Sequence, residues 1–208
     1  MHRRLVRSDA PGSRGTGLAD PGESGPPRPI PIPPDTLAEG VALVTAACQG
    51  RRSGYSGLTA AVGHICRSAG FEVGHVYIGC AGTGQILPSR IWYLAPPASR
   101  FTTFVRATSL SPLVPGQGLP GRVVCTGAPL IVDPLFDDVH APRAHAAVAS
   151  GLRSACAYPV VANPELVVVL EFLTSGSIRS TCELDALIEQ LAAVLTPHLR
   201  DLELEDLR

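Results

Sequence analysis

The most apolar part of the chain, from Tyr158 to Leu173, restricts the folds open to it more than any other stretch. An Asn-Pro-Glu segment at 163–165 interrupts it, and Glu171 adds a second carboxylate. A membrane-spanning helix needs roughly 18–20 consecutive apolar residues, so this stretch cannot form one. We instead expect two buried strands, 154–161 and 166–173, joined by a turn at the interruption.

The segments before this hairpin predict two helices followed by two strands. Apolar residues at helical spacing predict a first helix from Thr36 to Cys48, opened by a capping box of Thr36 and Glu39. A second helix should end at Gly70. Runs of β-branched and aromatic residues predict strands at 73–78 and 90–94, whereas 101–108 fits either a helix or a strand.

The remaining segments predict shorter elements and one long final helix. We expect a short helix at 119–126, a short strand at 130–132 and an alanine-rich helix at 141–150. A second capping box at 180–183 should open the final helix. This order of elements indicates an α+β fold around a mostly antiparallel β-sheet.

Proline and glycine divide the chain into a tail and a folded part. Eight of the 20 prolines and five of the 21 glycines fall within residues 1–34. We therefore expect a disordered Pro/Gly-rich tail at 1–35, a folded domain at 36–198 and a C-terminal helix extension at 199–208. The proline tract at 26–34 favours extended polyproline II, as a spacer or, alternatively, as a proline-motif ligand.

Composition limits the compartment and the partners. No apolar run follows the N-terminal arginines, so no secretory signal is predicted and we expect a cytoplasmic protein. The six cysteines form no CxxC pair and are expected to be small buried apolar residues rather than disulfides or zinc ligands. A net charge of −1 argues against nucleic acid as a partner, and no membrane partner is expected.

Motifs for catalysis and metal binding are weak. The sequence has no G-x-S-x-G, and without any lysine it has no P-loop. His140 and His145 lie near two aspartates, but a solvated loop explains them better than a metal site. His64 and His75 are expected to be core or surface histidines, with haem ligation left open. We therefore expect no metal site and no enzymatic activity, and no cofactor is identified.

Two glycine-rich motifs stand in the middle of the chain. Residues 115–123 read PGQGLPGRV, and residues 127–133 read GAPLIVD. Together with Trp92-Tyr93-Leu94 and further pieces in order along the chain, they resemble the GAF domains of bacterial sensor kinases and cyclic-nucleotide signalling proteins. The resemblance covers about 36–198. It implies a central antiparallel sheet flanked by helices, with long N- and C-terminal helices on one face.

The resemblance also implies a small-molecule pocket. Its expected ligand-binding residues are four apolar wall residues and two anion contacts: Trp92, Phe101, Phe104, Tyr158, Arg122 and Arg143. The alternative is that the aromatic side chains are ordinary core and that the arginines pair with Asp133 or Glu171.

The function implied is a non-enzymatic sensory or regulatory domain that binds a small molecule and signals through its terminal helices, as a dimer. Apolar residues repeating at seven give the final helix a stripe longer than one sheet face requires, although Pro197 should kink it. A GAF scaffold that dimerises without a ligand is one rival. A thiol-dependent free methionine sulfoxide reductase is another, but Pro120 stands where the family has a loop cysteine.

Two further expectations follow from the same resemblance. Without the loop cysteine, Cys125 would be a lone thiol, expected to be buried and inert. Covalent attachment of a bilin is not expected, because the Cys-His pair that it requires would fall at Pro142 and Arg143.

Overall fold

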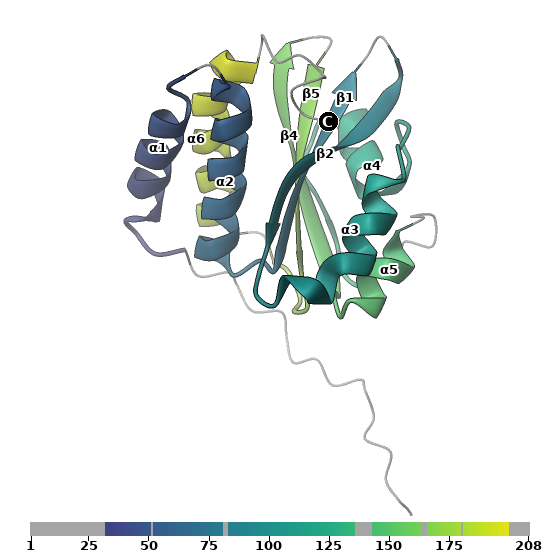
Figure 1. Ribbon diagram of the computed structural model, residues 1–208. Coiled ribbons are helices and arrows are strands. Elements are labelled where there is room, and N and C mark those ends of the chain that lie inside the picture. Colours follow the sequence, from purple (N-terminus) through teal and green to yellow (C-terminus); the bar gives the residue numbers. More distant parts are fainter. Residues whose placement is uncertain are drawn as a thin grey trace, which may run out of the picture.

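The computed structural model describes residues 32–50, 52–80, 83–135, 143–163, 166–179 and 181–199. In these ranges one antiparallel five-stranded sheet has the strand order β2-β1-β5-β4-β3 (Figure 1). The strands are β1 (Val73–Cys80), β2 (Gln85–Leu94), β3 (Leu130–Val132), β4 (Ser154–Asn163) and β5 (Leu166–Thr174). The predicted hairpin is therefore present as β4 and β5, and the α+β prediction is confirmed.

Helices cover both faces of the sheet. The first face carries α1 (Thr36–Ala47), α2 (Ser53–Ala69) and α6 (Cys182–Leu199), with α1 packed on α2 and α6 rather than on strands (Figure 1). The second face carries shorter helices: η1 (Ala98–Phe101), α3 (Thr102–Ser109), α4 (Gly118–Thr126) and α5 (Ala144–Ala149). The segment at 101–108, which fitted either structure, is therefore mostly helical.

Two separate apolar cores follow from the alternation of side chains along the strands. On β4, Cys156 and Tyr158 belong to the core of the first face, whereas Ala155 and Ala157 belong to that of the second. The first core is completed by the apolar stripe of α6, whose buried residues are Leu184, Leu187, Ile188, Leu191, Leu195 and Leu199. The predicted periodicity of the final helix thus serves, at least in part, to cover the sheet.

The predicted capping box at Thr36 is wrong. The helix begins after Asp35 without a side-chain cap, and Thr36 is its first residue. Thr36 is 4% exposed, and its carbonyl accepts a hydrogen bond from Nε2 of His64 at 2.9 Å. Thr36 is therefore a buried residue of the first turn, in contact with α2, and not the residue before the helix. At the final helix, Thr181 caps instead, since its Oγ1 accepts from the Leu184 amide at 3.2 Å.

The cysteines whose side chains the structure describes divide into two groups. Cys48, Cys66 and Cys156 are buried, as expected, and burial raises the pKa of the Cys156 thiol. Cys125 and Cys182 are exposed, so the expectation of burial is wrong for both. Cys125 lies in the last turn of α4, near the C-cap Gly127, and the buried residues of this helix are all earlier in the chain.

Several expectations fall outside the described residues. The tail at 1–31, the extension at 200–208 and His140 are among them, so the predicted boundaries stay predictions. None of the helices in the described ranges combines the length and apolarity that crossing a bilayer requires.

Candidate functional site

Five polar side chains are buried together on the second face of the sheet. We call them the Arg143 cluster: His75, Tyr77, Thr108, Arg143 and Glu171. Alternation along β1 places His75 and Tyr77 on the same face, and the strand register sets His75 opposite Glu171 of β5. Thr108 comes from α3, and Arg143 precedes the first residue of α5.

An ion pair lies at the centre of the cluster. Nη1 of Arg143 donates to Oε2 of Glu171 at 2.9 Å, and Nη2 donates to Oε1, so the pair is bidentate. The two side chains are 7% and 1% exposed. The guanidinium also lies over the rings of Tyr77 (5.2 Å) and Phe104 (5.5 Å). Such a pair is stable only while both partners are present, because a single buried charge keeps its full desolvation cost.

His75 is held neutral inside this face. It is fully buried, stacks on Trp92 with ring centroids 3.7 Å apart, and meets the Tyr77 ring edge-on. Burial, the hydrogen bond to the Ser89 carbonyl and the nearby Arg143 charge together lower the pKa of His75 to about 3; burial is the largest cause, the Ser89 bond opposes it and the Arg143 charge adds to it. Nε2 lies 3.1 Å from the Ser89 carbonyl and must donate to it. Nδ1 is then an unprotonated acceptor, without a partner among the described residues.

Two hydroxyl groups in the cluster also lack hydrogen-bond partners among the described residues: those of Tyr77 and Thr108. They are near enough for Thr108 to influence the pKa of Tyr77, which burial raises, yet they do not meet in hydrogen-bond geometry. Unpartnered buried polar atoms are rare in folded proteins because each costs about 1–3 kcal/mol. Three of them around one ion pair mark this place as unusual.

The adjoining cavity is small. It has a volume of about 20 Å³ and is lined by Phe104, Leu119, Leu135, Arg143, Ala144, Ala147, Glu171 and Leu173. That is room for about one water molecule. A ligand larger than a water molecule would require these side chains to move.

The glycine-rich motif shapes the helix beside this cavity. Gly116 and Gly118 have φ of +87° and +61°, which favours glycine at both positions. At Gly121 the reason is space, because an added Cβ would lie 2.5 Å from the Val114 carbonyl oxygen. The compact loop starts α4 so that Leu119 reaches the cavity lining.

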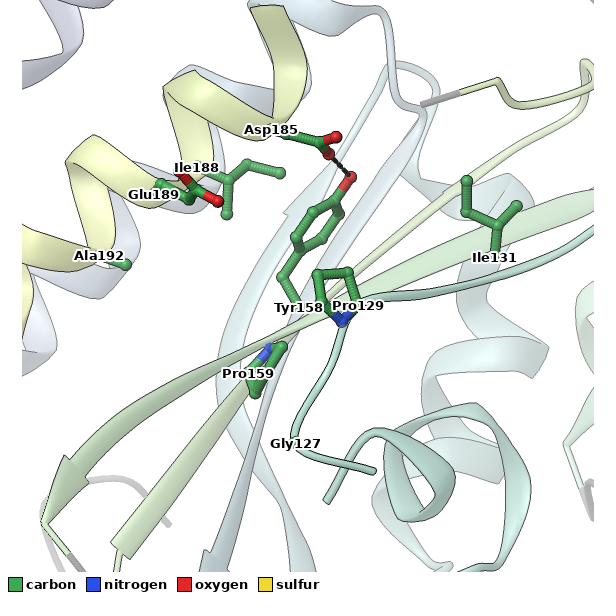
Figure 2. A pocket seen from close by; sticks show the side chains of 9 residues that line it. All are labelled: Gly127, Pro129, Ile131, Tyr158, Pro159, Asp185, Ile188, Glu189 and Ala192. Atoms are coloured by element: carbon green, nitrogen blue, oxygen red, sulfur yellow. Dashed lines mark hydrogen bonds between the residues drawn. The ribbon is translucent and has the colours of Figure 1, made fainter. Parts of the chain in front are cut away.

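The structure brings four of the six expected site residues to the second face. Trp92 stacks on His75 and meets Phe104 edge-on at 6.1 Å, Phe101 is buried in the same core, and Arg143 lies in the cluster. Tyr158 faces the other way: its hydroxyl donates to Oδ1 of Asp185 on α6 at 2.8 Å (Figure 2).

The two arginines expected as anion contacts, Arg122 and Arg143, differ in position. Arg122 is partly exposed on α4 and is not among the residues that line either described cavity. The alternative that these arginines pair with Asp133 or Glu171 is confirmed for Arg143, which pairs with Glu171. Asp133 pairs with a different arginine, Arg153, at 3.3 Å.

Sequence reasoning missed His75, Tyr77 and Thr108 as members of the site. A signal existed for the first two, because an alternating polar-apolar run in a strand places His75 and Tyr77 on one face. Glu171 was a stronger signal, being a lone carboxylate in an otherwise apolar strand. Thr108 had none, since its helix was itself ambiguous in the sequence.

Comparison with known proteins finds similarity in structure but none in sequence families. No family model matches the chain, and no curated protein does. Solved structures do match. A GAF domain of a phosphoenolpyruvate-protein phosphotransferase from Coxiella burnetii has a TM-score of 0.61 at 14% identity, over 79% of this chain and 92% of that one.

Two enzymes match as well. A free methionine-R-sulfoxide reductase from Neisseria meningitidis, solved with its substrate, has a TM-score of 0.58 at 14% identity, over 78% of this chain and 87% of that one. The fRMsr of Staphylococcus aureus has a TM-score of 0.58 at 10% identity, over 78% of this chain and 94% of that one.

These enzymes correct the expectation that the chain has no enzymatic activity. That expectation rested on missing motifs, but two proteins of the same fold are reductases, so neither the fold nor the absent motifs exclude catalysis. At 10–14% identity the likenesses establish the fold alone. With its antiparallel sheet between a layer of long terminal helices and a layer of short ones, the chain has a GAF-like fold.

Proposed function

We propose that the chain is a small-molecule-binding regulatory domain and that its ligand site is the Arg143 cluster. The observation that carries this proposal is the set of unpartnered polar atoms around the buried ion pair. A face selected only for stability would fill these positions with apolar side chains, which bury without a hydrogen-bonding cost.

The cluster defines what the ligand must offer. A donor group would meet Nδ1 of His75, which can only accept. Polar groups of either kind would meet the hydroxyls of Tyr77 and Thr108, and an anionic group would share the guanidinium of Arg143 with Glu171. Trp92 and Phe104 supply aromatic surface beside it. A small polar molecule with an anionic group and a flat apolar part fits these demands.

The terminal helices are the proposed route of the signal. α1 and α6 pack on each other, and α1 leaves Leu37 and Leu43 more than a third exposed. These leucines support a contact with a second helix-bearing partner, a second copy of the chain being the simplest. Ligand binding would act through them only if the ligand has unequal affinity for two arrangements of the helices.

Thermal unfolding of the full chain with a panel of cyclic nucleotides, haem and small organic acids tests the ligand site. A ligand that binds the folded state alone raises the melting temperature in a concentration-dependent way. Tyr77→Phe should weaken that shift while raising the stability of the unliganded chain by about 1 kcal/mol, because it removes a hydroxyl that has no partner.

Tyr93→Phe is the matched control. Tyr93 lies on the neighbouring strand but packs with the first-face core, so its variant should bind like the unmodified chain. If every compound leaves the melting temperature unchanged, the scaffold rival, which the 20 Å³ cavity favours, takes the place of the proposal. If the shift is equal in both variants, the ligand binds elsewhere.

Reduction of free methionine sulfoxide is the second candidate, favoured by the likeness to two reductases. Among the described cysteines, the exposed thiols are Cys125 and Cys182, and neither is among the residues that line the two described cavities. Turnover of free methionine sulfoxide with a dithiol reductant would support this activity, and its loss in Cys125→Ser or Cys182→Ser would identify the thiol. Absence of turnover in the full chain would remove the candidate.

A further inference from the structure

A larger cavity opens on the first face of the sheet, between α6 and the edge strand β3 (Figure 2). We call it the α6–β3 cavity. Its volume is about 550 Å³, within the range of roughly 300–1,000 Å³ that small-molecule sites occupy. The residues that line it are Gly127, Pro129, Ile131, Tyr158, Pro159, Asp185, Ile188, Glu189 and Ala192.

The cavity exists because the first face is covered unevenly. α6 packs on β4, the last full-length strand, whereas β3 lies beyond it at the sheet edge and is three residues long. The loop from Gly127 to Pro129 leads into β3 and forms one wall, opposite α6 (Figure 2). Ile131 is left 38% exposed above this space. The floor and walls are therefore largely apolar.

Among the described residues that line the cavity, the charged side chains are all acidic. Asp185 and Glu189 are four residues apart on α6, so their carboxylates lie on the same side of the helix, and Figure 2 shows both on the side of the cavity. Tyr158 donates its hydroxyl proton to Asp185 at 2.8 Å, which fixes the orientation of that carboxylate. None of the described lining residues is basic.

We propose that the α6–β3 cavity binds a small organic cation with an apolar body, such as a protonated aromatic amine. The ammonium group would lie between the carboxylates of Asp185 and Glu189, and the apolar body would lie against Ile131, Ile188 and Pro159. Charge-assisted hydrogen bonds from an ammonium to carboxylates are stronger than neutral ones, and the apolar walls add the burial of the ligand's ring. This site is separate from the Arg143 cluster and takes ligands of opposite charge.

Three probes with one ring system and different charge test the proposal: tryptamine (cationic), tryptophol (neutral) and indole-3-acetate (anionic). Calorimetric titration of the full chain at low salt should show tryptamine binding about tenfold more tightly than tryptophol, and indole-3-acetate binding more weakly than both. Asp185→Asn with Glu189→Gln should weaken tryptamine binding by about tenfold or more and bring it to the level of tryptophol. The amide oxygen introduced by Asp185→Asn would still accept from the Tyr158 hydroxyl, which protects the fold.

Glu183→Gln is the matched control, since Glu183 is an exposed carboxylate in the first turn of the same helix and does not line the cavity. Its affinity for tryptamine should be unchanged, as should that of Tyr77→Phe in the Arg143 cluster. Three results would overturn the proposal: no tryptamine binding up to its solubility limit, equal affinity for tryptamine and tryptophol, or undiminished binding in the double variant.

Discussion

The two faces of the sheet bury their side chains in different ways. The first face is covered by three long helices, and its core is almost wholly apolar: Leu184, Leu191 and Leu195 are fully buried against the sheet. The second face is covered by short helices and buries a charged pair, a neutral histidine and two unpartnered hydroxyls. Apolar burial stabilises wherever it occurs, whereas buried polar groups stabilise only when they are paired. The apolar core of the first face therefore stabilises the fold, whereas the unpartnered polar groups of the second face lower the free energy of unfolding.

The largest effect should come from breaking the ion pair of the second face. Arg143→Met leaves the Glu171 carboxylate, 1% exposed, without its partner, and should cost about 3–5 kcal/mol of unfolding free energy. Denaturant unfolding measures the loss. Arg143→Met with Glu171→Met should recover most of it, because the second charge is then gone. A single variant as stable as the unmodified chain would show that the pair is not buried in solution.

A truncation on the first face should cost nearly as much for a different reason. Leu191 of α6 is fully buried in the first core, so Leu191→Ala leaves a cavity and should lose about 3 kcal/mol. Denaturant unfolding measures this loss as well. Val194→Ala is the control, because Val194 is only partly buried on the same helix and its truncation should lower the free energy of unfolding by less. Equal losses at both positions would mean that α6 does not cover the sheet through Leu191.

His75 should make stability depend on pH. Its folded pKa of about 3 lies below the ordinary value of 6.5, so the unfolded chain binds this proton first as the pH falls. The contribution is fully present above pH 6.5 and is lost toward pH 3, amounting to about 2 kcal/mol between pH 7 and 5.

Unfolding of His75→Phe across pH 7 to 5 checks this value, since the variant should lack that part of the slope. Leu191→Ala is the control, because it removes no titratable group and its curve should run parallel to that of the unmodified chain. If the two variants show the same slope, His75 is not held neutral by the second face.

The smallest changes in unfolding free energy should come from replacing two glycines by alanine. One glycine faces backbone atoms on the second face, and the other faces side-chain ends in the first core. A Cβ at Gly121 would meet the Val114 carbonyl oxygen at 2.5 Å, and backbone yields little, so Gly121→Ala should cost about 1–2 kcal/mol. A Cβ at Gly57 would meet only side-chain ends, those of Cys48 and Leu195. These can shift, and alanine favours the helix, so Gly57→Ala should be within about 1 kcal/mol of neutral by thermal unfolding. The reverse order would mean that the first core is the more tightly packed.

Much of the secondary structure could be predicted from local patterns. Gly70 ends α2 in the left-handed region at φ +73°, as a helix-terminating glycine should. The predicted Thr36 cap is wrong because the helix begins one residue earlier, after Asp35, so that Thr36 is already inside the first turn. Tyr158 and Trp92 were expected in one pocket, yet they lie on opposite faces, because a strand pattern does not say which layer covers which side.

The sequence by itself determined the order of elements, the buried hairpin and the glycine loop, because helical and strand periodicity and backbone conformation depend on near neighbours. Only the tertiary structure decided that Arg143 meets Glu171, that His75 and Tyr77 are buried beside them, and that a cavity opens between α6 and β3. These features depend on how layers distant in the chain are stacked, and the alternation within one strand does not show which other element covers its faces.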